Sequence, residues 1–320
     1  MDLERLVAAL GAVEVVGRAP VEVRDLAYDA RAVTPGTLFF CVPGARADGH
    51  DFAPEAVERG AVALVVERPL EPAVPQLVVR DARASMAVVA DEFFRRPTQE
   101  LAVAGVTGTS GKTTTAFLLY AILAAAGRRP GLLGTIEARV GGERRGVVRT
   151  TPEAIDLQRT FREMLDAGDR SCAMEASSHA SQQHRLDRVR FAALVFTNLS
   201  QDHLDFHGDM ESYFEAKRRL FVEGRPPAAV NVGDVYGRRL AAELPEALTF
   251  GFAPGAVVGP GALAGIELKL RGRFNAENAL GALAAARLLG IDDAAIARGL
   301  ESVRGVPGRF ESVGKGSRSR

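Results

Sequence analysis

The feature that most constrains the fold is the segment 107–114, which reads Thr-Gly-Thr-Ser-Gly-Lys-Thr-Thr. An apolar run at 101–106, typical of a buried strand, precedes it, and a stretch with helical composition at 113–126 follows it. A strand, a glycine-rich turn and a helix N-terminus in this order form a cradle for a polyphosphate, because backbone N–H groups and the helix dipole favour the same anion. The segment therefore predicts an ATP-binding α/β domain.

Two glycines and two polar residues carry this prediction. Gly108 and Gly111 let the backbone amides face phosphate oxygens without a Cβ in the way. Lys112 is expected to reach the β- and γ-phosphates, and Thr113 to hold Mg²⁺. The general phosphate-loop pattern needs a glycine five residues before Gly111, where Val106 stands, so the match is incomplete. A glycine-rich turn with an exposed lysine is the alternative interpretation.

Composition excludes several classes of protein. The 40 basic and 40 acidic residues balance, so nothing indicates attraction to nucleic acid or to an anionic membrane. No stretch approaches the ~18 uninterrupted apolar residues of a membrane helix, and the opening residues lack the pattern of a secretory signal. Cys41 and Cys172 have no pair spacing and fit a reducing compartment. We expect a cytoplasmic, monomeric protein that inserts into no membrane.

The chain divides near Arg-Arg-Pro-Thr at 95–98, where proline ends a helix. The block 1–98 has strand-like pieces at 21–26, 38–42, 62–66 and 77–79 and helical stretches at 53–59 and 82–94. The block 99–308 alternates strands at 101–106, 170–174 and 192–197 with helices at 113–126, 153–167 and 275–289. We predict an α/β protein: a small N-terminal domain, a phosphate-loop domain with a mostly parallel, helix-flanked sheet, and a disordered remnant at 309–320.

Polar side chains gather after two of the predicted strands. Glu175 ends one strand, and His203 lies a few residues beyond another. Because the carboxyl ends of parallel strands meet at one edge of a sheet, both are expected near the phosphate loop. Mg²⁺ prefers oxygen ligands, so Glu175 is the natural metal ligand and His203 a second. His184 and His207 are better explained as structural or surface residues.

Lys217 lies on the apolar face of a predicted helix at 211–222. Its neighbours on that face are Tyr213, Phe214, Leu220 and Phe221. One interpretation is a lysine whose stem covers apolar surface while its amine reaches water. The other is an amine held near the sheet edge with a lowered pKa. A neutral amine can add CO₂ to form a carbamate, which is an anionic metal ligand. The residues alone leave both interpretations open.

Several segments, taken together and in order, resemble the Mur ligases. They are 107–114, Thr-Thr-Pro at 150–152, Met-Glu-Ala-Ser-Ser-His at 174–179, Gln-His-Arg at 183–185, Phe-Thr-Asn-Leu-Ser-Gln-Asp-His-Leu-Asp-Phe-His-Gly at 196–208 and Tyr-Phe-Glu-Ala-Lys at 213–217. Within that family they are most similar to the MurE type, which adds the third residue to UDP-N-acetylmuramoyl-L-alanyl-D-glutamate. The resemblance covers 20–311, and the family uses this shorter phosphate-loop signature.

The resemblance implies an ATP site, a Mg²⁺ site and catalytic residues. Its ATP-binding set is Gly108, Thr109, Ser110, Gly111, Lys112, Thr113, Thr114, Asn275 and Asn278. Its metal set is Thr113, Glu175, His203 and Lys217, the last as its carbamate. Lys112, Lys217 and His203 are the residues expected to act in catalysis.

The resemblance also implies a site for the UDP-muramoyl dipeptide. Its residues are Tyr28, Ala30, Ala45, Arg46, Ala47, Thr150, Thr151, Ser177, Gln183 and Arg185. The family usually has serine where this chain has Ala30. Loss of one neutral hydrogen bond at that position should weaken substrate binding by about 0.5–1.5 kcal/mol.

The activity that the resemblance implies is an ATP-dependent amide ligase of peptidoglycan precursor synthesis. The D-glutamyl carboxylate would form an acyl phosphate, and a diamino acid, meso-diaminopimelate or L-lysine, would displace phosphate from it. The family continues with a further Rossmann-like domain, to which the tail at 312–320 has no likeness, so we expect this chain to bind its ligands but not to ligate them. The alternatives are a fragment that only binds ATP or UDP-muramoyl peptide, and a related ligase such as a folylpolyglutamate or cyanophycin synthetase.

Overall fold

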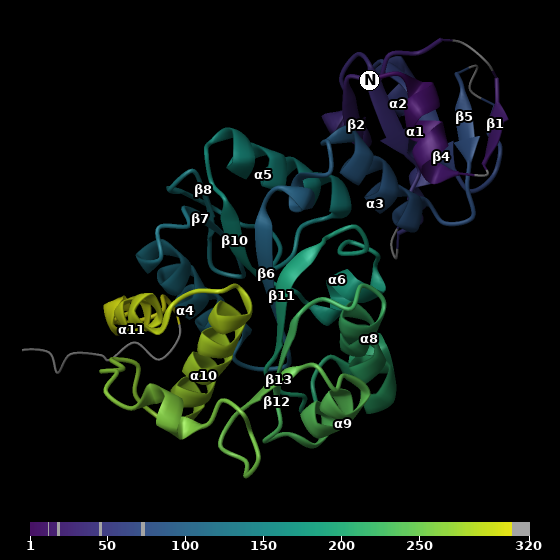
Figure 1. Ribbon diagram of the computed structural model, residues 1–320. Coiled ribbons are helices and arrows are strands. Elements are labelled where there is room, and N and C mark those ends of the chain that lie inside the picture. Colours follow the sequence, from purple (N-terminus) through teal and green to yellow (C-terminus); the bar gives the residue numbers. More distant parts are fainter. Residues whose placement is uncertain (12, 18–19, 45–46, 72–73, 309–320) are drawn as a thin grey trace, which may run out of the picture. The chain divides into compact units, whose positions relative to one another are not determined.

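The computed structural model describes residues 1–308 except 12, 18–19, 45–46 and 72–73 (Figure 1). Its contacts divide the chain into two compact units. The first unit comprises Met1–Pro97 together with Pro152–Arg162 and Gln182–Arg188, and the second comprises Thr98–Thr151, Glu163–Ser181 and the residues from Val189 onward. Two short segments of the predicted second block therefore pack with the first unit. The tail at 309–320, predicted to be disordered, lies outside the described residues.

The first unit is built on a mixed sheet. Its strands are β1 (Glu14–Val16), β2 (Asp25–Ala27), β3 (Thr37–Phe40), β4 (Ala61–Val66) and β5 (Gln76–Val78). In the described residues their order is β1-β5-β4-β3-β2, with β1 antiparallel to β5 and the other neighbours parallel. Of the predicted strand at 21–26, only the last two residues belong to β2.

Helices cover both faces of this sheet, and the alternation of side chains along the strands explains why. They are α1 (Leu3–Leu10), α2 (Ala53–Glu58) and α3 (Ala82–Phe93). In β3, Leu38 and Phe40 join the apolar cluster that includes residues of α1 and α3, whereas Phe39 joins the cluster that includes residues of α2. Successive strand residues point to opposite faces, so a fully apolar strand such as β3 is buried on both.

The second unit is built on a larger, mostly parallel sheet. Its strands are β6 (Ala102–Thr107), β7 (Pro130–Leu133), β8 (Ala138–Val140), β9 (Glu143–Arg145), β10 (Ser171–Glu175), β11 (Phe191–Phe196), β12 (Ala228–Asn231) and β13 (Leu248–Phe250). In the described residues the order is β13-β12-β11-β6-β10-β7-β8-β9, parallel from β13 to β7 and antiparallel beyond. The loops after β6, β10 and β11 therefore leave the same edge of the sheet from adjacent strands.

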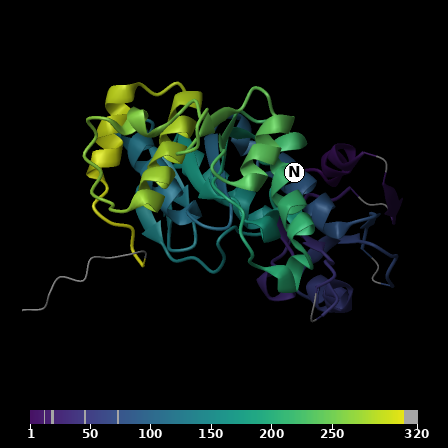
Figure 2. The same ribbon diagram turned by 90° about the horizontal axis from the view of Figure 1, so that it is seen from below.

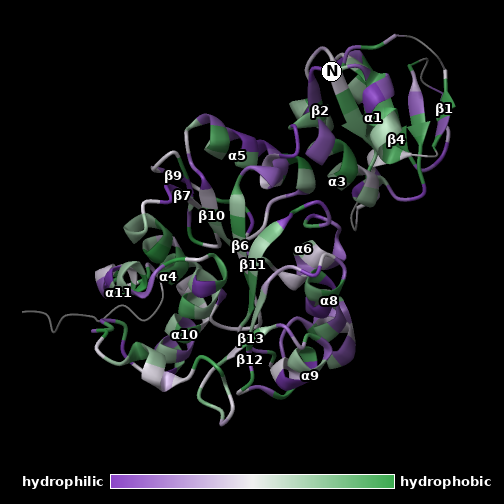
Figure 3. Ribbon diagram, in the orientation of Figure 1, coloured by the Kyte–Doolittle hydropathy of each residue, from purple (hydrophilic) through white to green (hydrophobic). Residues whose placement is uncertain are grey.

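The helices of this unit are α4 (Lys112–Ala125), α6 (Ser178–Gln182), α7 (Leu204–His207), α8 (Met210–Val222), α9 (Val235–Glu243), α10 (Arg273–Leu288) and α11 (Asp293–Ser302). Helix α5 (Ala154–Asp166) belongs to the first unit up to Arg162 and to the second unit from Glu163. One apolar cluster joins α4, α10 and α11 to strands β6, β10 and β11. Figure 2 shows α10 and α11 side by side, and Figure 3 shows the apolar character of the central strands β6 and β11. Among the described residues, no helix combines the length and the hydropathy needed to cross a membrane.

Helix α11 approaches α4 so closely that one position requires glycine. A Cβ on Gly299 would lie 2.4 Å from the Cα of Ile122 and 2.7 Å from its backbone nitrogen. Gly299→Ala is therefore expected to push the helices apart and to lower the free energy of unfolding by about 1–3 kcal/mol. Urea unfolding measures this change. In the control Gly305→Ala the new Cβ meets nothing within 4 Å, and equal stability of the two variants would contradict the prediction.

Candidate functional site

The phosphate loop lies between β6, which ends at Thr107, and α4, which begins at Lys112. Gly108 has φ +147° and Gly111 has φ +87°, values that favour glycine. A Cβ on Gly108 would lie 1.9 Å from the Oγ1 of Thr197, and one on Gly111 would lie 2.3 Å from the Oδ1 of Asn278. The predicted order of strand, glycine turn and helix is confirmed, and neither glycine has room for a side chain.

Lys112 folds back over this loop. Its Nζ donates to the carbonyl oxygens of Gly108, at 3.0 Å, and Thr109, at 2.8 Å. The ammonium is therefore held within the turn whose backbone would surround a phosphate group. The position of Lys112 fits the predicted role of a phosphate-binding cation and does not fit a lysine extended into solvent.

Glu175 is the last residue of β10 and is 1% exposed. Its Oε1 accepts from the backbone N–H of Thr135 at 2.7 Å, and its Oε2 accepts from the hydroxyls of Thr113 and Thr135, each at 3.1 Å. These three donors, one backbone N–H and two hydroxyl groups, are neutral. A buried carboxylate costs free energy unless its charge is compensated. Glu175 and Thr113 together are therefore suited to a hard divalent cation.

His203 follows β11 and adopts φ +53°. Its side chain is 44% exposed, and its Nε2 lies 3.5 Å from the Oδ2 of Asp202. The ring packs edge-on against His179, with centroids 4.8 Å apart, and His179 stacks on Phe206 at 4.1 Å. His203 and Glu175 thus follow strands on either side of β6 at the same sheet edge, as predicted.

The other two histidines lie in different settings. His207 is buried, and its Nε2 lies 3.0 Å from the hydroxyl of Ser178. Burial is the main cause that lowers the pKa of His207 to about 4, so its ring is neutral at neutral pH. His184 belongs to the first unit, where its Nδ1 lies 2.6 Å from the Oδ2 of Asp187. These settings are consistent with structural roles.

Lys217 occupies the buried face of α8 and is 1% exposed. Its Nζ donates to the carbonyl oxygen of Gly108 at 2.9 Å and lies 4.5 Å from the ring centroid of Tyr213. Burial, with a contribution from the charge of Lys112, lowers the pKa of Lys217 well below its usual value. Of the two interpretations, the structure favours an amine held under the phosphate loop over a lysine that reaches water.

Helix α10 approaches the loop from another side. The Oδ1 of Asn278 is the atom that a Cβ on Gly111 would meet. The Nδ2 of Asn278 donates to the Oδ1 of Asn275 at 3.4 Å, and the Nδ2 of Asn275 donates to the carbonyl oxygen of Arg271 at 2.9 Å. Thr114 lies buried in the first turn of α4. The predicted nucleotide residues of α10 and α4 therefore meet around Gly111.

The predicted muramoyl-dipeptide residues of the second unit lie beside Glu175. The Oγ1 of Thr151 donates to the carbonyl oxygen of Glu175 at 2.9 Å and lies 3.2 Å from the Oγ of Ser177. The Oγ1 of Thr150 lies 3.1 Å from the Oγ1 of Thr135. Thr135, which contacts both Glu175 and Thr150, was not singled out from the sequence, because a lone threonine in a loop carries no recognisable signal.

Gln183 and Arg185 belong to the first unit. The Nη2 of Arg185 lies 2.5 Å from the Oε1 of Gln183 and 2.8 Å from the Oε1 of Glu153. Glu153 is buried and also faces Arg83, with 3.3 Å between Nη1 and Oε2. Sequence reasoning missed Glu153, although it directly follows the Thr-Thr-Pro segment. It holds the guanidinium of Arg185 in place.

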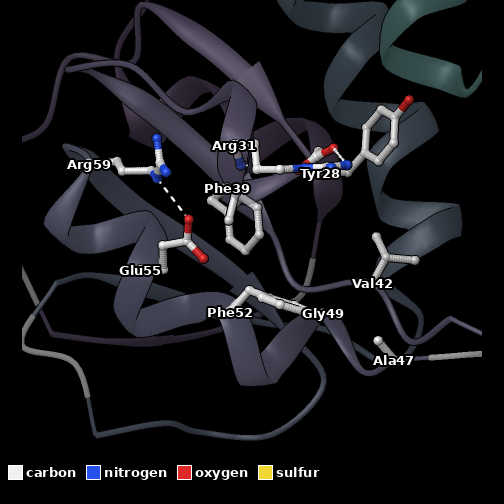
Figure 4. Close-up of a pocket in the computed structure, with 11 residues that line it drawn as sticks. Tyr28, Arg31, Phe39, Val42, Ala47, Gly49, Phe52, Glu55 and Arg59 are labelled. Atoms are coloured by element: carbon white, nitrogen blue, oxygen red, sulfur yellow. Dashed lines mark hydrogen bonds and ion pairs between the residues drawn. The ribbon is translucent and has the colours of Figure 1, made fainter.

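The first unit also contains a cavity of about 670 Å³. Its lining residues are Tyr28, Asp29, Ala30, Arg31, Phe39, Val42, Ala47, Gly49, Phe52, Glu55 and Arg59 (Figure 4). Three predicted substrate residues, Tyr28, Ala30 and Ala47, therefore line one cavity. The predicted residues Ala45 and Arg46 lie outside the described residues. Arg31 pairs with Asp29 at 2.7 Å, and the hydroxyl of Tyr28 donates to Asp156 at 2.7 Å.

Comparison with known families agrees with this arrangement. Residues 106–286 match the Mur ligase middle domain, and residues 22–118 match the catalytic domain of the Mur ligase family. The chain belongs to the Mur ligase family. Both matches include the predicted phosphate loop at 107–114.

Individual relatives carry the name UDP-N-acetylmuramoyl-L-alanyl-D-glutamate--2,6-diaminopimelate ligase. The protein of Geobacillus thermodenitrificans (strain NG80-2) is 43% identical over 99% of this chain and 70% of its own length. That of Geobacter metallireducens (strain ATCC 53774 / DSM 7210 / GS-15) is 42% identical over 98% of this chain and 67% of its own. A solved structure of a ligase of the same name superposes with a TM-score of 0.77 at 28% identity, covering 91% of this chain and 64% of that one. The chain thus spans about two thirds of the length of these relatives.

Proposed function

We propose that the chain binds ATP and UDP-N-acetylmuramoyl-L-alanyl-D-glutamate for an ATP-dependent amide ligation that adds 2,6-diaminopimelate to the D-glutamyl residue. The observation that carries the proposal is the contact between Thr113 and the buried Glu175, 3.1 Å apart, at the start of the phosphate loop helix. It joins the nucleotide-binding motif to a buried carboxylate. The names of the relatives supply the identity of the two other substrates.

The residues would act by holding charge and geometry. Lys112 and the first amides of α4 would bind the ATP phosphates, which keeps the γ-phosphorus in place for attack. A carboxylate oxygen of the substrate attacks that phosphorus, the bond to the ADP oxygen breaks, and ADP leaves. The diamino acid nitrogen then attacks the acyl carbon, phosphate leaves with the bonding electrons, and the nitrogen loses a proton. Lys112 compensates negative charge that develops on the phosphoryl oxygens.

A divalent cation fits the same place. Glu175 and the hydroxyl of Thr113 would hold Mg²⁺, with His203 and the carbamate of Lys217 as further ligands. When bound, Mg²⁺ supplies positive charge at the β- and γ-phosphates. No group of three or more His, Cys, Asp or Glu in the described residues is arranged to hold a metal. The predicted set contains two such side chains, which agrees with the habit of Mg²⁺ of keeping several water ligands.

The cavity of the first unit would take the UDP group. Its volume of about 670 Å³ is in the usual range for small-molecule sites. Figure 4 shows Phe39 and Phe52 among its lining residues, with rings suitable for contact with a base. The guanidinium groups of Arg31 and Arg59 also line it and pair with Asp29 and Glu55. Guanidinium groups recognise phosphate oxygens well. The cytoplasmic location and the monomeric state stay predictions.

Restoring the serine that the family usually has offers a test of this cavity. Ala30 lines the cavity and is 5% exposed. Ala30→Ser is expected to tighten binding of the UDP-muramoyl dipeptide by roughly 2- to 10-fold, because one neutral hydrogen bond contributes about 0.5–1.5 kcal/mol. Isothermal titration calorimetry measures the change. Ala32→Ser, an exposed position in the same helical turn, is the control, and equal affinities of the two variants would remove Ala30 from the site.

The proposed function as a whole is tested by separating binding from turnover. Calorimetry should show binding of ATP with Mg²⁺ and, independently, of the UDP-muramoyl dipeptide. Phosphate release that requires ATP, the dipeptide and diaminopimelate together would demonstrate ligation. Binding of both ligands without turnover would agree with the expectation that this chain binds its ligands but does not ligate them. Absence of binding to either ligand would overturn both that expectation and the proposed function.

A further inference from the structure

The loop that follows β11 is hydrogen-bonded to the phosphate loop through one side chain. The Oδ1 of Asn198 accepts from the backbone N–H of Ser110 at 2.9 Å, and its Nδ2 donates to the carbonyl oxygen of Ser110 at 3.1 Å. The backbone carbonyl of Asn198 also accepts from the N–H of Thr109 at 2.9 Å. Asn198, 88 positions away in the chain, thus binds both the N–H and the carbonyl group of Ser110.

Neighbours of Asn198 reinforce this contact. The Oγ1 of Thr197 donates to the carbonyl oxygen of Ser110 at 2.7 Å, and the backbone N–H of Ser200 donates to the Oγ1 of Thr109 at 3.1 Å. The space is also closed, because a Cβ on Gly108 would overlap the Oγ1 of Thr197. The two loops are therefore in close contact at Gly108.

The β11 loop is itself anchored from its far side. The side chain of Asn231 donates from Nδ2 to the carbonyl oxygen of Thr197 at 2.8 Å, and Asp234 accepts from the backbone N–H of Leu199 at 3.2 Å. Asp234 also accepts from the N–H of Gly237 at 2.9 Å and so caps α9. The residues on either side of Asn198 are therefore held by Asn231, at the end of β12, and by Asp234, at the start of α9.

We infer that Asn198 is a positioning residue that sets the phosphate loop in its nucleotide-binding conformation before the nucleotide arrives. The inference rests on the proposed function. The backbone N–H groups of Thr109 and Ser110 donate to Asn198. The N–H groups in the first turn of α4 have no acceptor within the helix, so they can donate to phosphate oxygens. An amide side chain suits this place, because its carbonyl oxygen accepts from the N–H and its NH₂ group donates to the carbonyl of the same residue.

The inference predicts a selective loss. Asn198→Ala is expected to weaken ATP binding by roughly 10- to 100-fold, since two hydrogen bonds that preorganise the loop disappear. Asn198→Asp should also weaken it, because a second acceptor would face the carbonyl of Ser110. Affinity for the UDP-muramoyl dipeptide should stay within about twofold of the parent, since the loop is not part of the cavity in the first unit. Gln201→Ala, an exposed side chain on the same loop, is the matched control and should bind ATP like the parent.

Hydrogen exchange of the Ser110 amide, followed by NMR in the chain without nucleotide, tests the contact independently. The amide should exchange slowly in the parent and in Gln201→Ala, and fast in Asn198→Ala. If Lys112→Ala loses ATP binding while Asn198→Ala keeps it, the inference is wrong and the proposed function stands. If neither substitution affects ATP binding but Ser110 loses its protection in Asn198→Ala, the contact exists and the nucleotide site has been misassigned, which overturns both. Rapid exchange of Ser110 in the parent would overturn the inference directly.

Discussion

Lys112→Ala is expected to abolish measurable ATP binding. The Nζ of Lys112 lies within the turn of the phosphate loop, at 3.0 Å from the carbonyl oxygen of Gly108 and 2.8 Å from that of Thr109. Nucleotide phosphates entering this turn would exchange those neutral carbonyl acceptors for charged oxygens, and charge-assisted hydrogen bonds are roughly twice as strong as neutral ones. Removing the ammonium should therefore weaken ATP binding by more than about 100-fold, measured by calorimetry in the presence of Mg²⁺.

Two further substitutions distinguish a local loss of ATP binding from unfolding of the protein. Lys269→Ala removes a lysine from an exposed position of the same unit and should leave ATP affinity within about twofold. Lys112→Arg keeps the charge but not the compact ammonium, so it should lose most of the affinity as well. The UDP-muramoyl dipeptide should bind all three variants alike. Unchanged ATP affinity in Lys112→Ala would show that the loop does not bind nucleotide.

Much of the fold could be predicted from the sequence where a strand is buried on both faces. β6, β10 and β11 lie at the centre of the sheet, and their near-continuous apolar runs mark them within a residue or two. The run at 21–26 misled the prediction. Val23 is fully buried in the cluster that also contains Leu3 and Leu6 of α1, yet only Asp25 and Leu26 of that run pair in a sheet. In the sequence, an apolar loop residue that packs against a helix cannot be distinguished from an apolar residue in a strand.

The grouping of segments into units could not be predicted from their order along the chain. The helix at 153–167 shows an apolar face in the sequence, but not which surface that face covers. In the structure Ala154 and Ile155 join the same cluster as Leu26 and Leu38. Contacts between residues more than one hundred positions apart leave no local pattern, so the sequence does not show that 152–162 and 182–188 group by contacts with the first unit.

The candidate site shows the same limit. Glu175 and the phosphate loop could be found from the sequence, because each follows a recognisable strand, and strand ends meet at one edge. The alternatives for Lys217 could not be separated, since the choice depends on the carbonyl of Gly108 lying 2.9 Å from its amine. Asn198 was passed over because asparagine in a loop is common, and its partner Ser110 lies far away in the chain.

Lys217 is the second residue whose loss should have a large effect. Its amine is buried beneath the phosphate loop, and its pKa lies well below the usual value because of burial and the charge of Lys112. A lowered pKa increases the neutral fraction of the amine, and a neutral amine can attack the carbon of CO₂ and release a proton, which gives a carbamate. Incubation with ¹³C-bicarbonate should therefore produce one protein carbamate signal by NMR that is absent from Lys217→Met.

The functional consequence follows from the change in charge. A carbamate at Lys217 would add an anionic oxygen ligand close to Gly108, in the site where Mg²⁺ would supply positive charge to the phosphates. Lys217→Met keeps the apolar stem and removes this ligand, so the gain in ATP affinity that Mg²⁺ produces in the parent should fall by roughly 10-fold or more, as should any ligase turnover. In the smaller variant Lys217→Ala, formate or acetate can occupy the vacated space, and we expect either to restore part of the loss.

The controls for Lys217 use its own helix. Arg218→Met has the same new side chain at the next position, where it breaks ion pairs to Glu215 and Glu243 that are partly exposed. Such pairs contribute little, so stability should change by less than about 1 kcal/mol and Mg²⁺-dependent ATP binding should not change. Lys217→Met should fold at least as stably as the parent, because it removes a buried amine from an apolar helix face. A carbamate signal that persists in Lys217→Met, or an unchanged response to Mg²⁺, would show that the buried amine serves packing and not the metal site.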